Sequence, residues 1–258
     1  MDVSAYLKRI GYDGPLAPTG ETLRGLHLAH SLAVPFENLD IHLGRLIVLD
    51  EAALFDKIVR RRRGGFCYEL NGLFAALLRQ LGFEVALLSA RVADGLGNFG
   101  PDFDHLTLRV EAEEPWLADV GFGDCFGQPL RWDEPGDQAR EGRLYRVALG
   151  DGEAKLLASD DGGDWDDQYL FRLQPYELSD FIPMCRWQET SPESIFTRKR
   201  VVTRMTPAGR ITLSDDRLIV TEAGAHGVRA ERALAGPPEV AAALREHFGI
   251  ELEIAGQD

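Results

Sequence analysis

The sequence is poor in cysteine and has no long apolar run. Its 258 residues include three cysteines, at positions 67, 125 and 185. A low, odd number of cysteines argues against a disulfide framework and indicates a reducing compartment. No cysteine or histidine spacing typical of a zinc site occurs, so no metal is expected. No stretch reaches the roughly 18 apolar residues that span a membrane, and no secretion signal opens the chain. We therefore expect a cytoplasmic protein without a membrane partner.

The sequence also has a deficit of positive charge, and its formal net charge is −14. This excess of acids disfavours nucleic acid as a partner and means that local groups must hold any anionic ligand. Two basic clusters, residues 60–63 and 198–200, are candidates for that task. Both could equally be solvated faces that balance nearby acids.

The first third of the chain has the apolar spacing of helices, at residues 4–10, 21–33 and 50–63. The clearest helix follows Gly64 and Gly65, and Gly82 ends it. Its apolar side chains recur at helical spacing: Leu70, Leu73, Phe74, Leu77, Leu78 and Leu81. Cys67 lies three residues before the first of these and therefore shares their buried face at the first turn.

After Gly82 the pattern changes to short alternating segments separated by turn residues. Strands are predicted at residues 84–91, 105–110, 116–122, 144–148 and 169–173, and they form a small antiparallel barrel or sheet. Later segments predict strands at residues 195–204, 210–213 and 217–221, and then a closing helix at residues 237–248. Helices followed by strands and a mixed end favour an α+β fold over a doubly wound sheet.

Cys67 is a candidate nucleophile because of its position at the start of a helix. Free backbone N–H groups and the positive end of the helix dipole favour a thiolate there. Gly64 and Gly65 leave room for a substrate carbonyl to approach, and the backbone N–H of Tyr68 could point at an oxyanion. The alternative is that Cys67 is a small buried apolar residue, as most cysteines are.

A predicted hairpin places His105 near Asp119. A five-residue turn signal separates residues 105–110 from residues 116–121, and pairing of Val110 with Trp116 makes His105 and Asp119 diagonal neighbours. An aspartate can hold a histidine in the tautomer that suits a neighbouring thiol. The alternative is a solvated edge pair, and sequence spacing alone does not bring this hairpin to Cys67.

Several motifs resemble those of the arylamine N-acetyltransferase family. Residues 63–71, RGGFCYELN, resemble its nucleophile motif, and residues 119–123, DVGFG, resemble its aspartate motif, with His105 at the usual distance before it. Weaker similarities occur in residues 9–12, RIGY, residues 35–39, PFENL, and residues 190–196, TSPESIF. The similarities follow the family order from residue 6 to about residue 221, and together they are specific.

The resemblance implies a three-part fold and a set of site residues. A helical bundle would occupy residues 1–83, a β-barrel residues 84–190 and an α/β lid residues 191–258. The catalytic triad would be Cys67, His105 and Asp119. The acceptor pocket would be lined by Phe36, Val92 and Phe122. The phosphates of coenzyme A would meet the backbone of a loop made of Gly123, Asp124, Cys125, Phe126 and Gly127.

This chain departs from the family pattern at two places. Arg186 and Trp187 stand where many members have asparagine or a smaller polar residue, and Asp124 puts an acid into the phosphate loop. Both departures concern the binding of the cofactor rather than the triad.

The implied reaction is acetyl transfer from acetyl-CoA to an aromatic amine or hydrazine through an acetyl-cysteine. An aromatic amine suits this chemistry because it is largely unprotonated near neutral pH. Three other functions stay open: an amide synthase of the same family in natural-product assembly, a cysteine hydrolase with the same triad, and a non-catalytic binding module.

Overall fold

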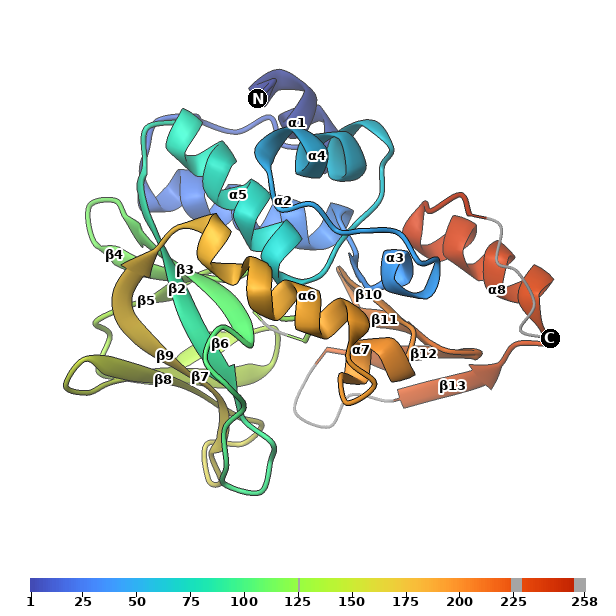
Figure 1. Cartoon of the computed structure of the whole chain (residues 1–258). Coiled ribbons are helices and arrows are strands. Elements are labelled where there is room, and N and C mark those ends of the chain that lie inside the picture. Colours follow the sequence, from blue (N-terminus) through green and yellow to red (C-terminus); the bar gives the residue numbers. More distant parts are fainter. Residues whose placement is uncertain (125, 224–228, 253–258) are drawn as a thin grey trace.

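The computed structural model describes residues 1–124, 126–223 and 229–252. Helices from the first third of the chain cover one side of a strongly curved antiparallel sheet, and a second sheet with its own helix lies beside them (Figure 1). The predicted α+β fold, with a helical bundle, a barrel and a further α/β part, is confirmed. Among the described residues, no helix is long and apolar enough to cross a membrane.

Helices dominate the part before residue 83. They are α1 (Val3–Ile10), α2 (Gly20–Ala33), α3 (Leu39–His42), α4 (Glu51–Phe55), which continues as a π-helical turn (Asp56–Arg60), and α5 (Cys67–Gln80). Side chains of Asp2, Thr19 and Asp50 accept backbone hydrogen bonds at the starts of α1, α2 and α4, as polar N-caps do. The helix predicted over residues 50–63 begins at Glu51 and ends early, at Arg60.

Helix α5 is the centre of the largest core cluster. Its side chains at the predicted apolar positions 70, 73, 74, 77 and 78 are fully buried, as are Leu106, Leu108 and Val110 of the neighbouring sheet. The chain leaves the helix through Gly82, whose φ of 94° is in the left-handed region that favours glycine. The predicted helix, its buried face and its stop are confirmed.

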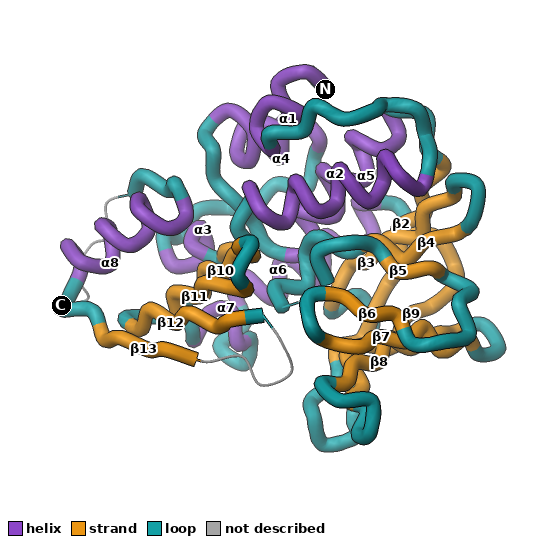
Figure 2. The backbone as a smooth tube through the Cα atoms, turned by 180° about the vertical axis from the view of Figure 1, so that it is seen from behind, coloured by secondary structure: helices purple, strands orange, loops and turns teal. Residues whose placement is uncertain are grey.

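The curved sheet is the predicted barrel. Its strands are β2 (Glu84–Val92), β3 (His105–Glu111), β4 (Pro115–Ala118), β5 (Leu130–Arg131), β6 (Gln138–Arg140), β7 (Arg143–Leu149), β8 (Glu153–Ser159) and β9 (Asp166–Tyr176). The spatial order is β5-β4-β3-β2-β9-β8-β7-β6. The side chain of Gln138 bridges the two edges, because it accepts from the N–H of Arg131 at 2.7 Å and donates to its carbonyl at 2.9 Å. This link nearly closes the barrel (Figure 2).

The predicted set of barrel strands was incomplete. The strand predicted over residues 116–122 ends at Ala118, because Asp119 and Gly121 form a turn in which the Asp119 carboxylate accepts from the Gly121 N–H at 3.0 Å. Strands β5, β6 and β8 lie at residues where no strand was predicted. In β8 the buried positions alternate with partly exposed ones up to Leu157, but small alanines at buried positions and the apolar Leu157 at a partly exposed one make that pattern weak in the sequence.

The second sheet joins the two ends of the chain. Its strands are β10 (Val201–Thr206), β11 (Gly209–Ser214), β12 (Arg217–Glu222) and β13 (Arg229–Ala233), and β1 (Phe36–Glu37) pairs with β10. Helix α8 (Pro237–Ala243) continues as a π-helical turn (Leu244–Phe248), and its side chains form a small core with those of the sheet. Residues 36–37, which fall in the first predicted domain, therefore complete a sheet of the third.

One predicted strand is wrong at its start. Residues 195–198 form helix α7 (Ile195–Arg198), and only the second half of the predicted strand over residues 195–204 is extended, as β10. The hydroxyl of Ser194 accepts from the N–H of Phe196, which caps the short helix. A 3-10 turn (Leu178–Phe181) leads into helix α6 (Ile182–Thr190), which lies between the barrel and the second sheet (Figure 1).

Candidate active site

Cys67 is the first residue of α5 and is almost completely buried. The carboxylate of Glu69 accepts from the N–H of Phe66 at 3.1 Å, which caps the helix start, and its other oxygen accepts from Lys57 at 2.7 Å. Lys57 also pairs with Asp40 at 2.8 Å. A buried ionic network therefore fixes the turn that presents Cys67.

Gly64 and Gly65 are required by the packing of this turn. A Cβ at Gly64 would lie 1.9 Å from the carbonyl oxygen of Pro35, and one at Gly65 would lie 2.7 Å from the side chain of Glu69. Close packing against the protein's own backbone and the capping carboxylate therefore explains both glycines without a substrate. They allow the chain before β1 to pack against the start of α5.

His105 and Asp119 are in contact, as the hairpin predicted. Strands β3 and β4 pair with Val110 opposite Trp116, and Nε2 of His105 lies 2.7 Å from Oδ2 of Asp119. Both side chains are buried. The alternative of a solvated edge pair is therefore wrong.

Four donors hold the carboxylate of Asp119. Oδ2 also accepts from the hydroxyl of Tyr169 at 2.9 Å, and Oδ1 accepts from the amide of Asn71 at 2.8 Å and from the N–H of Gly121 at 3.0 Å. Burial by itself would raise the pKa of Asp119, but the charge and the hydrogen bonds of His105, with those of Asn71 and Gly121, lower it. Asp119 is thus held as an anion beside the imidazole.

The loop that carries Asp119 packs directly on the start of α5. A Cβ at Gly121 would lie 2.9 Å from Cα of Cys67 and 2.8 Å from the amide nitrogen of Asn71. Asn71 lies one turn after Cys67, and its side chain also accepts from the N–H of Val120 at 2.9 Å. This close approach brings the hairpin to the cysteine, which the sequence spacing alone did not determine.

Cys67 and His105 line one cavity of about 660 Å³. The predicted acceptor residues also line it, and these are Phe36, Val92 and Phe122. The ring centroid of Phe122 lies 5.1 Å from that of His105, in an edge-on arrangement. Helix α7 contributes Ile195 and Phe196 to the wall, so the chain segment that was predicted as a strand closes one side of the cavity.

Other predicted site residues do not line this cavity. The side chain of Tyr68 is buried and donates to the carbonyl of Phe103 at 2.7 Å, and Phe126 is packed in the barrel core. The N–H of Gly127 donates to the carboxylate of Glu141 at 2.9 Å, and its carbonyl accepts from His27 at 2.8 Å. Both polar groups of Gly127 are therefore already in use.

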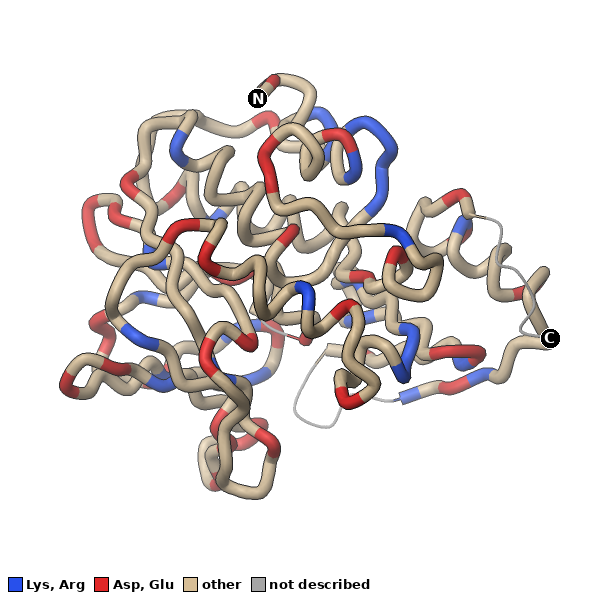
Figure 3. The backbone as a smooth tube through the Cα atoms, in the orientation of Figure 1, with Lys and Arg blue, Asp and Glu red and all other residues tan. Residues whose placement is uncertain are grey.

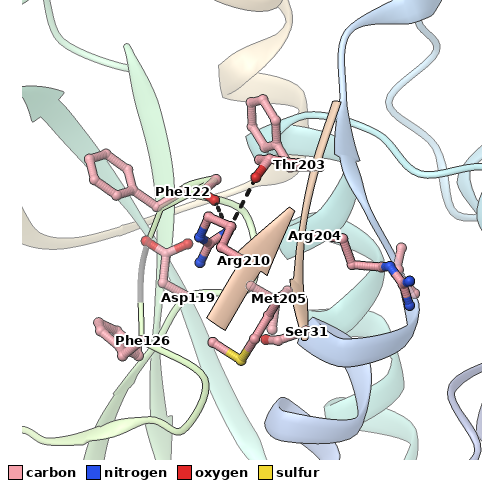
Figure 4. A pocket seen from close by; sticks show the side chains of 12 residues that line it. Ser31, Asp119, Phe122, Phe126, Thr203, Arg204, Met205 and Arg210 are labelled. Carbon is pink, nitrogen blue, oxygen red and sulfur yellow. Dashed lines mark hydrogen bonds between the residues drawn. The ribbon is translucent and has the colours of Figure 1, made fainter. Parts of the chain in front are cut away.

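The first two residues of the predicted phosphate loop, Gly123 and Asp124, do line the cavity. The Asp124 carboxylate pairs with Nε of Arg210 at 3.0 Å, and the Arg210 guanidinium also donates to the carbonyl of Gly123. Figure 4 shows Arg210 reaching from β11 toward this loop, beside Thr203. Cys125 lies outside the described residues. Sequence reasoning missed Arg210, because its partner lies 86 positions earlier in the chain.

The two basic clusters have other roles. Arg63 is buried and pairs with Glu37 at 2.8 Å and with Asp40 at 3.0 Å, so it stabilises the fold. The guanidinium groups of Arg198 and Arg200 donate to backbone carbonyls. Residues 60–63 and 198–200 do not line the cavity among the residues that the structure describes. Acidic positions are spread over the barrel and the second sheet (Figure 3).

Of the residues that depart from the family pattern, Asp124 lines the cavity, whereas Arg186 and Trp187 are not part of its wall. Arg186 pairs with Glu189 at 3.0 Å, and Trp187 is partly exposed on α6. Gln188, the next residue along the helix, lines the cavity instead and donates to Asp104 at 2.8 Å.

Burial raises the pKa of the Cys67 thiol well above its ordinary value, and the charges of Asp104 and Cys185 add to this effect. A hydrogen bond from the backbone of Leu106 acts in the opposite direction. The position at a helix start therefore does not by itself account for a thiolate at Cys67.

The sequence pattern of a family described as N-acetyltransferase matches residues 19–257. An arylamine N-acetyltransferase of Escherichia coli (strain K12) is 36% identical over 97% of this chain and 89% of its own length. That of Mycolicibacterium smegmatis is also 36% identical, over 100% of this chain and 95% of its own.

Solved structures agree with the sequence comparison. The arylamine N-acetyltransferase of Salmonella typhimurium superimposes with a TM-score of 0.88 at 36% identity, covering 96% of this chain and 90% of that one. The Mycobacterium marinum arylamine N-acetyltransferase in complex with CoA gives 0.87 at 31% identity, over 96% and 93%. The fold and these matches define an acyltransferase. The chain belongs to the arylamine N-acetyltransferase family.

Proposed function

We propose that this protein transfers an acetyl group from acetyl-CoA to arylamines, and also to arylhydrazines, through an acetyl-Cys67 intermediate. One observation carries the proposal: Cys67 at the start of α5 and His105, which is bound to Asp119, line the same cavity. The names of the relatives support the amine acceptor, and the M. marinum complex with CoA supports the donor. We place the reaction in the cytoplasm.

In the first half-reaction Cys67 becomes the acyl carrier. Nε2 of His105 is engaged by Asp119, so Nδ1 receives the proton of the thiol. The sulfur attacks the thioester carbonyl, the bond to the coenzyme A sulfur breaks, and the imidazolium returns its proton to the leaving thiolate. Asp119 lowers the cost of the charged imidazole, which offsets the burial of the thiol. The products are acetyl-Cys67 and free coenzyme A.

In the second half-reaction the amine attacks the acetyl-cysteine. His105 removes the proton from the attacking nitrogen, and the bond between the acetyl carbon and the Cys67 sulfur breaks. Backbone N–H groups at the start of α5, including that of Tyr68, are proposed to stabilise the oxyanion in both steps. The product is the N-acetylated amine, and Cys67 regains its starting state.

The apolar part of the cavity is proposed to hold the aromatic ring. Phe36, Val92 and Phe122 supply two aromatic rings and a branched side chain beside the reacting sulfur. Aromatic side chains pack edge-on or offset against a substrate ring, which orients its amine.

Acetyl-CoA is proposed to enter along the wall formed by the second sheet. Arg210, Arg229, Thr203, Thr212 and Thr221 line this wall with cationic and hydroxyl groups, which suit phosphate oxygens. Gly123 and Asp124 complete it, and Arg210 neutralises the acid that the sequence places there. Phe126 and Gly127 are not part of this proposal, because the first is core and the second has both backbone groups bonded.

Intact-protein mass spectrometry tests the proposal. Acetyl-CoA alone should add one acetyl mass to a peptide that contains Cys67, and an arylamine should then remove it as the acetylated amine. Labelling of Cys125 or Cys185 instead would refute the assignment. Transfer only from an acyl carrier protein would favour the amide synthase, and loss of the acetyl group to water would favour the hydrolase. Absence of any acylation would favour a binding module.

A further inference from the structure

A second histidine lies behind the active site and makes one hydrogen bond to Asp119 and another to Gly127 of the loop that follows. His27 is on α2, is fully buried, and had no role in the sequence analysis. Its Nε2 accepts from the backbone N–H of Asp119 at 3.0 Å, and its Nδ1 lies 2.8 Å from the carbonyl oxygen of Gly127. Both partners are about 90 to 100 positions away in the sequence.

These two partners fix the tautomer of His27. A backbone N–H can only donate, so Nε2 has to be unprotonated, and a carbonyl can only accept, so Nδ1 has to carry the hydrogen. The ring is therefore neutral and bonded at both nitrogens. Protonation of Nε2 would place a donor against the N–H of Asp119.

Aromatic neighbours hold the ring in this orientation. Phe126 stacks on it at 5.7 Å with an interplanar angle of 22°, and Phe74 of α5 meets it edge-on at 5.9 Å. In Figure 4, Phe126 and Asp119 lie on the same stretch of chain after β4. Phe126, which was predicted to bind the cofactor, instead packs against the histidine.

We propose that His27 is a positioning residue for the transfer reaction, and that it fixes the backbone of Asp119 so that the carboxylate meets His105. The inference rests on the proposed function of Cys67, His105 and Asp119. Three side chains and the N–H of Gly121 hold the two carboxylate oxygens of Asp119, but His27 holds its main chain. Rotation of this peptide would move both oxygens away from the imidazole.

This role requires a neutral imidazole at His27, and the surroundings of the ring strongly favour the neutral form. Burial lowers the pKa of His27 to about 4, and the hydrogen bonds to Gly127 and Asp119 and the charge of Asp119 offset only part of this effect. Arg140 contributes in the same direction as burial. His27 therefore keeps its acceptor nitrogen at any pH at which the enzyme is expected to work.

Two amide substitutions separate the two hydrogen bonds. The terminal amide of glutamine reaches the place of Nε2, so His27→Gln can still accept from Asp119. The shorter amide of asparagine reaches the place of Nδ1, so His27→Asn can still donate to Gly127 but leaves the N–H of Asp119 without a partner. His27→Leu removes both bonds.

His30 provides a matched control on the same helix. It is also fully buried, meets Phe74 edge-on at 5.4 Å, and bonds to the hydroxyl of Tyr6 at 2.8 Å, with no hydrogen bond to the loop of Asp119 among those described. His30→Leu should reduce stability by an amount comparable with His27→Leu. It should not change the reactivity of Cys67.

The experiment measures the rate of Cys67 alkylation by iodoacetamide as a function of pH, together with the melting temperature and kcat for acetyl transfer. His27→Asn and His27→Leu should slow alkylation near neutral pH and lower kcat by roughly 3- to 10-fold, the value of one hydrogen bond. His27→Gln should stay within about twofold of the wild type, and His30→Leu should alter the melting temperature alone.

Equal losses in the asparagine and glutamine variants would overturn the proposal, as would unchanged alkylation in all three His27 variants. A loss of reactivity in His30→Leu as large as that in His27→Leu would show that the effect is one of general stability. Alkylation needs no acetyl-CoA, so these outcomes remain readable if the wild-type protein fails to transfer acetyl groups, which would refute the proposed function alone.

Discussion

The amide of Asn71 donates to Oδ1 of Asp119 at 2.8 Å. Asn71 lies one helical turn after Cys67, so this single bond connects the helix of the nucleophile with the loop of the aspartate. The same amide donates to the carbonyl of Leu106 at 2.6 Å, next to His105. Hydrogen bonds of Asn71 therefore link the three separate segments of the chain that carry the catalytic candidates.

We expect Asp119→Asn to lower kcat by about 10² to 10³, compared with about 10⁴ for the corresponding change in a serine-protease triad. All four groups around this carboxylate are donors or can donate. An asparagine amide would place a donor against at least one of them. Steady-state kinetics with acetyl-CoA and an arylamine measure the loss. Activity within twofold of the wild type would remove Asp119 from the triad.

We expect the ionisation of Cys67 to depend on His105. If the thiol and the imidazole share their proton as an ion pair, iodoacetamide should alkylate Cys67 rapidly well below the ordinary thiol pKa of about 8.5. His105→Gln should abolish this reactivity, because burial raises the thiol pKa and the hydrogen bond from the backbone of Leu106 offsets only part of this effect. An alkylation profile in the wild type that follows an ordinary or a raised thiol pKa would contradict the ion pair.

Asp104 gives a second test of the same equilibrium. Its charge is the largest contribution after burial to the raised pKa of Cys67, and its carboxylate accepts from Gln188. Asp104→Asn keeps the shape of the side chain and should shift the alkylation profile toward lower pH. A shift toward higher pH would mean that Asp104 acts through the structure and not through its charge.

Binding of acetyl-CoA should depend on Arg210 and not on Gly127. Asp124→Asn releases the Arg210 guanidinium from its carboxylate partner, so the KM for acetyl-CoA should fall by about twofold to fivefold while that for the amine stays unchanged. Arg210→Gln should raise the KM for acetyl-CoA.

Gly127→Val should lower the melting temperature but leave the KM values for acetyl-CoA and for the amine unchanged in the folded protein. A sharp rise of the acetyl-CoA constant in Gly127→Val would restore the whole loop as the phosphate site.

The buried arginine before the nucleophile should dominate the stability of this region. Arg63→Gln removes the buried guanidinium that pairs with Glu37 and Asp40, while Lys57 still pairs with Asp40, and breaking a buried ion pair costs about 3 to 5 kcal/mol. Arg61 is a matched control, because it pairs with Asp56 at 2.8 Å on the surface, where a pair contributes about 1 kcal/mol or less. Urea denaturation of both variants gives the comparison. Equal midpoints would show that the buried network adds no net stability.

Mild acid should destabilise the fold through His27. In the unfolded chain this histidine binds a proton below about pH 6.5, but in the folded protein its pKa is lowered to about 4. Between these values the unfolded state binds more protons, so stability falls as the pH falls, by about 3 kcal/mol for this residue. Urea midpoints from pH 7 to 4.5 should fall less steeply in His27→Leu. An unchanged pH dependence in this variant would contradict the lowered pKa.

Sequence patterns predicted the local structure of this site well. The helix start at Cys67 and the hairpin that pairs His105 with Asp119 both depend on residues close together in the chain, where spacing and turn signals are informative. Strand β8 and helix α7 were missed or assigned wrongly, because their local patterns are weak and their conformations depend on neighbours elsewhere in the fold.

The sequence by itself determined the family and the α+β class, and it predicted that Cys67, His105 and Asp119 form the triad. Only the tertiary structure decided that Arg210 neutralises Asp124, that Gly127 is engaged by Glu141 and His27, and that His27 holds the main chain of Asp119. These contacts join residues of different secondary-structure elements, most of them far apart in the sequence. Their existence depends on side-chain packing over the whole molecule, and no local pattern of charge or hydrophobicity carries that information.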